Sequence, residues 1–372
     1  MTDVSFKTRA VAGVQALQPY QPGKPLEELE REYGISHAVK LASNENPLGP
    51  GKKALAAIEA QLADLSRYPD GNGYALKKAL GKKHGVAMAR LTLGNGSNDI
   101  LEFLARAFVA PGDEVIFSEH AFAVYPIVTQ AVGGRAVVVP AKNYGYDLDA
   151  ILESITDRTR LIFIANPNNP TGTWLGESAL RHFMEKVPAS VLVVVDEAYY
   201  EYAADPALRA GDYASVMGWI EDYPHLVVTR TFSKAYGLAG LRVGYGVSRE
   251  DVADILNRVR QPFNTNSLAL AAAEAALEDE AHLQHSVKLN AEGMQVLTCA
   301  FDDMGLEYIP SVGNFVCVKV GDAASVYEAL LRAGMIVRPV ANYGLPDYLR
   351  VTIGRGDENA RFLDALKKIL SS

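Results

Sequence analysis

The sequence lacks the features of an extracellular, membrane-spanning or nucleic-acid-binding protein. Its two cysteines, Cys299 and Cys317, are too few for a disulfide framework or a zinc cluster, and they fit a reducing cytoplasm. No apolar run approaches the roughly 20 residues that span a bilayer, and residues 1–10 lack the apolar stretch of a signal peptide. Acidic residues outnumber basic ones, 44 to 36, which argues against nucleic acid as a partner. We therefore expect a cytoplasmic protein with a small-molecule ligand and no metal.

The 372 residues are enough for two domains behind an N-terminal arm. Residues 1–40 contain a Pro/Gly-bearing stretch and are interpreted as an irregular arm. Residues 41–265 alternate apolar runs with helical patterns, which predicts an α/β domain with a mostly parallel sheet flanked by helices. Residues 266–372 are predicted to form a connecting helix, over 266–304, and a smaller α+β domain, with the boundary within 260–300. The apolar runs are 115–117, 136–139, 161–164, 191–195, 226–228 and 242–247.

Polar motifs follow several of these runs, and ligands of open α/β sheets gather at the carboxyl ends of the strands. The motif at 166–172, Asn-Pro-Asn-Asn-Pro-Thr-Gly, is either a surface turn or a loop that points an amide into a cleft. Asp196 directly follows an apolar run, where a carboxylate is costly unless a cation meets it. It either caps the next helix or pairs with a protonated ring nitrogen, with the hydroxyl of Tyr199 nearby.

A lysine lies among small residues in the segment 231–242, Thr-Phe-Ser-Lys-Ala-Tyr-Gly-Leu-Ala-Gly-Leu-Arg. Lys234 alone would be a solvated surface lysine. Lysine is, however, the amine that forms Schiff bases, and burial near cations lowers its pKa. Thr231, Ser233 and Arg242 offer two hydroxyls and a guanidinium, which is a reasonable phosphate cradle.

A Gly/Ser-rich turn at 94–100 opens a helical pattern. Ser97 and Asn98 either cap that helix or leave its free N–H groups for a phosphate. One anion site, one carboxylate, one amine and one amide together make the arrangement that recurs in pyridoxal phosphate sites, where a lysine Schiff base faces an acidic partner of the pyridine nitrogen.

With these motifs the sequence resembles fold-type I, aspartate-aminotransferase-like enzymes, and within them the histidinol-phosphate aminotransferase family. The resemblance is nearly end to end. Besides Tyr20 it includes the segments 41–50 (Leu-Ala-Ser-Asn-Glu-Asn-Pro-Leu-Gly-Pro), 67–71 (Arg-Tyr-Pro-Asp-Gly) and 349–352 (Leu-Arg-Val-Thr). It implies pyridoxal 5'-phosphate as the cofactor, bound in the large domain.

The resemblance also implies a role for each cofactor residue. Lys234 forms the Schiff base and then carries the proton between the substrate α-carbon and the cofactor C4′. Asp196 keeps the pyridine nitrogen protonated, Tyr199 and Asn169 bond the phenolic oxygen, and Phe122 stacks on the ring, where many relatives have tyrosine. The residues implied around the cofactor phosphate are Ser97, Asn98, Thr231, Ser233 and Arg242.

Five further residues are implied at the substrate and at the subunit interface. Tyr68 resembles a tyrosine that reaches the phosphate from the other subunit, which implies a homodimer with shared active sites. Arg350 resembles the arginine that clamps the substrate carboxylate and, in histidinol phosphate, the phosphate. Arg338 and Tyr20 would supply the extra contacts of a phosphate, although either arginine could be a structural strand-end residue, and Asn46 is assigned to the substrate as well.

The reaction implied is ping-pong transamination in histidine biosynthesis, from glutamate to imidazole-acetol phosphate, giving 2-oxoglutarate and L-histidinol phosphate. Two alternatives within pyridoxal chemistry stay open at this point: an aromatic amino acid aminotransferase and an O-phosphoamino acid decarboxylase. A pyridoxal-binding transcription regulator is disfavoured, because only about 40 residues precede Leu41 and they contain no net basic helix pair.

Overall fold

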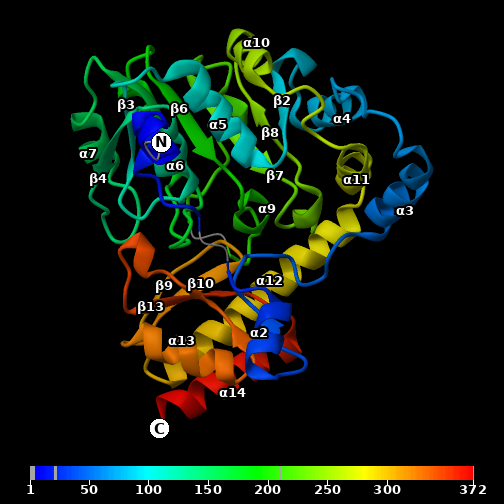
Figure 1. The fold of residues 1–372 in the computed structure, drawn as a ribbon, viewed down its shortest axis with the longest axis vertical. Helices are drawn as coiled ribbons and strands as arrows, with labels where there is room; N and C mark the ends of the chain where they lie inside the picture. Colours follow the sequence, from blue (N-terminus) through cyan, green and yellow to red (C-terminus); the bar gives the residue numbers. More distant parts are fainter. Residues whose placement is uncertain (1–4, 21–22, 209–210, 372) are drawn as a thin grey trace.

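The computed structural model describes residues 5–20, 23–208 and 211–371, and its largest element is a seven-stranded sheet (Figure 1). The strand order is β2-β8-β7-β6-β5-β3-β4. Strands β3 to β7 pair in parallel, and β8 is antiparallel to both of its neighbours. The prediction of a mostly parallel sheet is confirmed. The bounds are β2 Leu91–Gly94, β3 Glu114–Ser118, β4 Arg135–Val139, β5 Thr159–Ala165, β6 Leu192–Asp196, β7 Leu226–Thr231 and β8 Gly244–Val247.

A second, four-stranded antiparallel sheet lies at the other end of the molecule, at the bottom of Figure 1. Its order is β12-β13-β10-β9, and it packs against three helices through a separate apolar cluster. The smaller α+β unit expected near the C-terminus is therefore present, while its boundary stays a prediction. The bounds are β9 Tyr308–Ile309, β10 Phe315–Lys319, β12 Arg338–Pro339, β13 Tyr348–Thr352, α12 Glu280–Asp303, α13 Ala323–Arg332 and α14 Gly356–Leu370.

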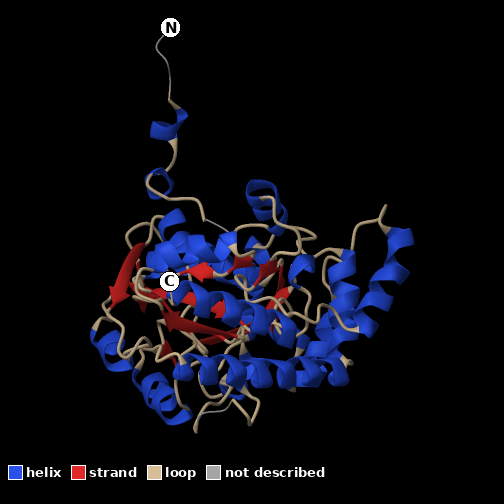
Figure 2. Ribbon diagram, turned by 90° about the horizontal axis from the view of Figure 1, so that it is seen from below, coloured by secondary structure: helices blue, strands red, loops and turns tan. Residues whose placement is uncertain are grey.

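The described part of residues 1–40 contains more regular structure than the irregular arm that was predicted. Residues 5–20 contain only two short elements: η1 (Phe6–Arg9) projects from the body (Figure 2), whereas α1 (Ala12–Gln15) lies against α6 (Val124–Ala131). Helix α2 (Leu26–Tyr33), however, buries Leu29 completely against the small-sheet unit. After it, β1 (Val39–Lys40) pairs with β11 (Met335–Ile336). The apolar residues of α2 follow helical spacing, a signal that the Pro/Gly content of this region obscures.

The expected single helix over 266–304 is two helices. Helix α11 (Ser267–Leu277) ends before Asp279, whose ψ of 60° is not helical, and α12 begins at Glu280. Asp279 lies against Gly51 and the backbone N–H of Lys53, at the start of α3 (Lys52–Gln61). Because α11 packs on α3 and on α4 (Tyr74–His84), it belongs to the core of the large sheet. A tertiary contact thus interrupts a helical pattern that looks continuous in the sequence.

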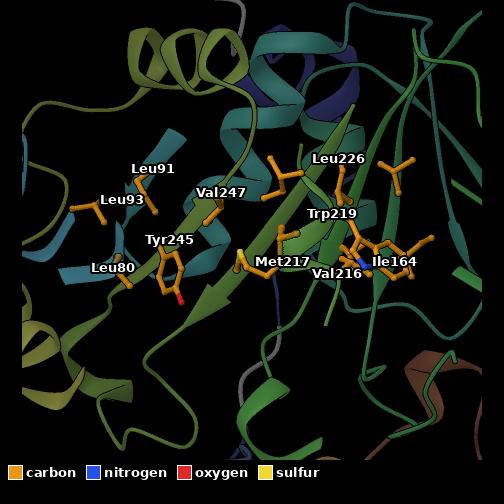
Figure 3. Packing of buried hydrophobic residues seen from close by; sticks show 14 of the residues in the cluster. Leu80, Leu91, Leu93, Ile164, Val216, Met217, Trp219, Leu226, Tyr245 and Val247 are labelled. Carbon is orange, nitrogen blue, oxygen red and sulfur yellow. The ribbon is translucent and has the colours of Figure 1, made fainter. Parts of the chain in front are cut away.

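Both faces of the large sheet are covered by helices because successive strand residues point to opposite sides. In β5, Ile162 and Ile164 enter one apolar cluster, shown in Figure 3, while Leu161 and Phe163 enter the other. Each fully buried side chain of this kind contributes about 1.5–3 kcal/mol. The first cluster packs under α4, α11, α7 (Leu148–Glu153) and α8 (Glu177–Lys186), the second under α5 (Ser97–Phe108), α6 (Val124–Ala131) and α10 (Glu250–Val259).

This arrangement brings the carboxyl ends of β3, β5, β6 and β7 to one edge of the large sheet, facing the four-stranded sheet. The polar motifs that follow these strands are therefore neighbours in space. In the part of the chain that the structure describes, no helix is both long and apolar enough to cross a membrane. The remaining short elements are η2 Leu62–Asp64, η3 Met88–Arg90, α9 Tyr200–Ala203, η4 Met217–Trp219, η5 Ala239–Leu241 and η6 Ala341–Tyr343.

Candidate active site

A cavity of about 200 Å³ lies between the edge of the large sheet and the small sheet. It is lined by every residue predicted for the site except Tyr68 and Asn46. The predicted residues that line it are Tyr20, Ser97, Asn98, Phe122, Asn169, Asp196, Tyr199, Thr231, Ser233, Lys234, Arg242, Arg338 and Arg350. Segments that follow five strands of the large sheet (β2, β3, β5, β6 and β7) and side chains from the small sheet thus meet in one place.

Lys234 is a part-buried lysine of this cavity and not a solvated surface residue. Its Nζ donates a hydrogen bond of 3.3 Å to the backbone oxygen of Ser43 and lies 5.5 Å from the centre of the Tyr199 ring. Burial lowers the pKa of the Lys234 amine to about 8, and the charges of Arg350 and Arg242 act in the same direction. Much more of this amine is therefore neutral near pH 7 than of an ordinary lysine, as a nucleophile requires.

Asp196 ends β6 as a buried carboxylate and caps no helix. Its two oxygens accept hydrogen bonds from the hydroxyls of Thr229, at 2.9 Å, and Tyr125, at 3.1 Å. Burial raises the pKa of the Asp196 carboxyl, and these two hydrogen bonds act against that increase. Among the described residues no cation forms an ion pair with it, so the carboxylate is available for a cationic atom of a ligand.

An anion cradle is built where α5 begins, beside the end of β7. Neither Ser97 nor Asn98 caps α5, whose N-cap position is Gly96. A Cβ on Gly96 would fall 2.6 Å from the Arg242 guanidinium, so the arginine lies against the helix start. The Arg242 guanidinium also donates to the Ser233 hydroxyl at 3.4 Å. Phosphate is commonly bound by donors of these three kinds: the free N–H groups at a helix start, hydroxyls and a guanidinium. Here the hydroxyls are those of Ser233 and Thr231, which are hydrogen-bonded to each other.

Arg350 reaches the cavity from the middle of β13. It donates to the side-chain oxygen of Asn169 at 2.6 Å and to the backbone oxygen of Ala42 at 2.8 Å. Its Nε is buried and has no partner within the described residues. An incoming anion would satisfy that donor and compensate the buried charge.

Arg338 lies beside Arg350, because the two residues face each other across the paired strands β12 and β13. The Arg338 guanidinium lies 5.8 Å from the centre of the Tyr20 ring. Tyr343 of η6 lines the same wall. Burial raises the pKa of the Tyr343 hydroxyl, while the charges of Arg350 and Arg338 lower it. The wall nearest the small sheet is therefore cationic.

Tyr68 and Asn46 do not line the cavity. Tyr68 is 82 % exposed and stacks on Phe263, with ring centroids 4.7 Å apart. The Asn46 amide is used inside the fold, where it donates to the Ala235 carbonyl and to the Ser286 hydroxyl. The assignment of Asn46 to the substrate therefore finds no support in this chain, because its donors are already bound.

The sequence interpretation missed three residues at the site: Asn44, Tyr125 and Tyr343. The Asn44 side chain donates to the Tyr199 hydroxyl at 2.8 Å, and Asn44 lines the cavity. Tyr125, three residues after Phe122, orients Asp196. The helical spacing of Phe122 and Tyr125 was the only signal available for Tyr125. Asn44 lies in the 41–50 motif, which does not tell it apart from Asn46, and Tyr343 has no local signature.

The fold and the site together define a fold-type I enzyme, in which a part-buried lysine of lowered pKa, a buried carboxylate and an anion cradle meet at the edge of an open α/β sheet. The chain belongs to the aminotransferase class I and II family, whose model matches residues 36–366.

Relatives in that family are similar over almost the whole length. The chain is 62% identical to histidinol-phosphate aminotransferase 2 of Pseudomonas fluorescens strain Pf-5, over 98% of each chain. It is 58% identical to histidinol-phosphate aminotransferase 1 of Idiomarina loihiensis, over 96% of each chain. Among solved structures, histidinol-phosphate aminotransferase from Sinorhizobium meliloti in complex with pyridoxal-5'-phosphate superposes with a TM-score of 0.88 at 31% identity, over 98% of each chain.

Proposed function

We propose that this protein is a pyridoxal-phosphate-dependent histidinol-phosphate aminotransferase. It would move the amino group between L-glutamate and imidazole-acetol phosphate, giving 2-oxoglutarate and L-histidinol phosphate, a step of histidine biosynthesis. The observation that carries the proposal is the pair Arg338 and Arg350, which face the same cavity as Lys234 from paired positions on adjacent strands. The names of the relatives above support the same substrate.

The residues present fit pyridoxal phosphate. The cradle of Ser97, Ser233 and Arg242 suits the phosphate of the cofactor, and Arg242 lies so close to Gly96 that a Cβ there would displace its guanidinium. The buried carboxylate of Asp196 suits its pyridinium nitrogen, and Phe122 offers a ring face in the cavity wall. When bound, the cofactor supplies an electron sink for the charge that develops when the substrate α-proton leaves.

The chain itself binds and moves the proton. Lys234, with its lowered pKa, would hold the cofactor, and its Nζ would take the α-proton of the substrate and later return it. Asp196, with both oxygens already hydrogen-bonded, is fixed in one orientation and would hold a proton on the ring nitrogen of the bound cofactor. Tyr199 and Asn169, which line the cavity, would hydrogen-bond the phenolic oxygen of the cofactor ring.

The substrate is oriented by the two arginines. The unpartnered Nε of Arg350, together with its terminal nitrogens, offers a fork that accepts a carboxylate or a phosphate. A phosphate ester has three terminal oxygens, so it also needs the donors that Arg338 and Tyr20 bring to the same wall. Glutamate and histidinol phosphate can therefore use one site in turn, as a ping-pong reaction demands.

A half-reaction assay tests this proposal. Cofactor-loaded enzyme is mixed with histidinol phosphate, phenylalanine or tyrosine, and the conversion of the bound cofactor to its amine form is followed by absorbance. We expect conversion by histidinol phosphate at concentrations at least tenfold lower than by either aromatic amino acid, because each extra hydrogen bond to a charged group contributes about 1.5–3 kcal/mol. Equal or better conversion by phenylalanine would favour the aromatic aminotransferase instead. Release of carbon dioxide from an O-phosphoamino acid, without 2-oxo acid formation, would favour the decarboxylase.

We further propose that the enzyme works in the cytoplasm as a homodimer in which Tyr68 reaches the cofactor phosphate of the partner subunit. In one chain Tyr68 lies outside the cavity and is 82 % exposed, near the exposed apolar residues Leu62 and Leu65. Complementation tests the sharing. Mixed dimers of Lys234→Ala and Tyr68→Ala chains contain one intact site if Tyr68 acts across the interface, so activity should return on mixing. If the mixture were no more active than the separate variants, Tyr68 would act in the site of its own chain or in no site.

A further inference from the structure

Tyr343 and His120 connect the two sheet units beside the cavity, and the proposed mechanism does not use this contact. Tyr343 belongs to η6 in the small-sheet unit, and His120 follows β3 in the large sheet. The His120 Nδ1 lies 2.6 Å from the backbone oxygen of Tyr343. A carbonyl oxygen can only accept a hydrogen bond, so Nδ1 carries the proton and donates. Both residues are more than nine-tenths buried.

His120 is itself held from behind by the loop that follows β5. The side-chain amide of Asn168 donates to the His120 backbone oxygen at 2.9 Å, and Asn168 is adjacent in sequence to Asn169 of the cavity wall. Gly344, with a φ of +79°, lets the η6 loop turn directly over the imidazole, where a Cβ would lie 3.3 Å from the ring. The position of Tyr343 is thus set by a residue of the other sheet.

The Tyr343 side chain lies where a hydrogen-bond donor, in addition to the two arginines, would distinguish a phosphate from a carboxylate. Tyr343 lines the same cavity as Arg338 and Arg350, and the charges of both arginines, with a hydrogen bond from Arg338, oppose the increase that burial causes in the pKa of the Tyr343 hydroxyl. A carboxylate is satisfied by the two-pronged fork of one arginine, whereas a phosphate monoester keeps a third terminal oxygen. A tyrosine hydroxyl that accepts from Arg338 still has its own proton to donate. It would therefore strengthen the hold on a phosphate more than the hold on a carboxylate.

We propose that Tyr343 is a specificity-determining residue for phosphate-bearing substrates, and that His120 is the positioning residue that keeps it beside the arginine pair. This inference rests on the proposed function and deepens it, because it names the group that separates histidinol phosphate from glutamate at a site both must use. His120 acts only through Tyr343.

The test measures kcat/KM for histidinol phosphate and for glutamate in holoenzyme variants. Tyr343→Phe removes the hydroxyl and should lower the ratio of the two kcat/KM values about tenfold, the usual effect of one hydrogen bond to a charged group. His120→Leu removes the donor to the Tyr343 carbonyl and should lower the ratio in the same direction. His120→Asn keeps a donor near the position of Nδ1 and should restore most of the ratio.

Tyr348→Phe is the matched control. The Tyr348 hydroxyl lies 3.0 Å from that of Tyr144, so it also joins the two sheet units, but neither tyrosine lines the cavity. The ratio should not change in this variant. An equal change in Tyr348→Phe, or an unchanged ratio in Tyr343→Phe, would overturn the proposal for Tyr343. Failure of His120→Asn to recover the ratio, in protein whose thermal midpoint matches wild type, would overturn the role of His120.

Inorganic phosphate separates this inference from the proposed function. It should compete with glutamate in the half-reaction, and its inhibition constant should rise about tenfold in Tyr343→Phe. If wild-type enzyme did not convert histidinol phosphate but this rise occurred, the substrate proposed above would be wrong and the phosphate selectivity of Tyr343 would stand. If histidinol phosphate reacted and the inhibition constant did not rise, the inference about Tyr343 would be wrong.

Discussion

The substitution Gly96→Ala should separate cofactor binding from folding. Gly96 has a φ of +83° and a ψ of 166°, a region that only glycine occupies readily, so alanine should lower the free energy of unfolding by about 1–3 kcal/mol. The new Cβ would also lie 2.6 Å from the end of the Arg242 side chain. A flexible guanidinium can move away, and its movement dismantles the cradle. Since a hydrogen bond to a charged group contributes about 1.5–3 kcal/mol, affinity for pyridoxal phosphate should fall roughly 10- to 100-fold.

The assay is a titration of apoenzyme with pyridoxal phosphate, followed by absorbance or by quenching of tryptophan fluorescence. Gly240→Ala is the matched control, because Gly240 lies two residues before Arg242 and a Cβ there would meet nothing within 4 Å. It should bind the cofactor like wild type. Wild-type affinity in Gly96→Ala, or an equal loss in Gly240→Ala, would refute the reasoning that the start of α5 and Arg242 form the phosphate cradle.

Three further substitutions test the surroundings of the site. Glu197→Gln leaves Arg230 buried without the carboxylate that lies 2.7 Å away, so the free energy of unfolding should fall by about 3–5 kcal/mol in urea titrations; a loss under about 1 kcal/mol would contradict this. Tyr125→Phe removes one donor to Asp196 and should slow the glutamate half-reaction about tenfold at unchanged thermal midpoint; an unchanged rate would show that Thr229 suffices. Burial lowers the pKa of His225 below its ordinary value of 6.5, which favours the neutral ring in the folded protein. Stability should therefore decrease as the pH falls below about 6.5, and His225→Phe should weaken that dependence; an identical pH dependence in the variant would contradict the assignment.

Much of the fold followed from local pattern. The runs at 161–164 and 191–195 are apolar at every position, and only strands covered on both faces need that, so the parallel sheet was predictable. Because the carboxyl ends of parallel strands lie at the same end of a sheet, the motifs after those runs were expected to lie close together. Asp196 and Lys234 could be brought together from the sequence for this reason alone.

The parts that could not be predicted depend on contacts between distant segments. Asn44 and Asn46 are two residues apart in one motif, and their roles differ because Asn44 takes a φ of +56° and turns toward Tyr199 and Thr352. Tyr343 reaches the cavity through a hydrogen bond to His120, more than 200 residues earlier in the chain. The break between α11 and α12 likewise comes from a contact with the start of α3. No periodicity in the sequence encodes such pairings.

The central claim is that Lys234 forms the Schiff base with the cofactor. Reduction of cofactor-loaded enzyme with borohydride converts that bond into a stable secondary amine, and peptide mapping by mass spectrometry locates it. Lys77, a partly buried lysine outside the cavity whose pKa is also lowered by burial, is the internal control. The account predicts one pyridoxyl group per chain, on the peptide containing Lys234 and absent from Lys234→Ala. A stoichiometric pyridoxyl group on Lys77 or another lysine, with Lys234 unmodified, would contradict it.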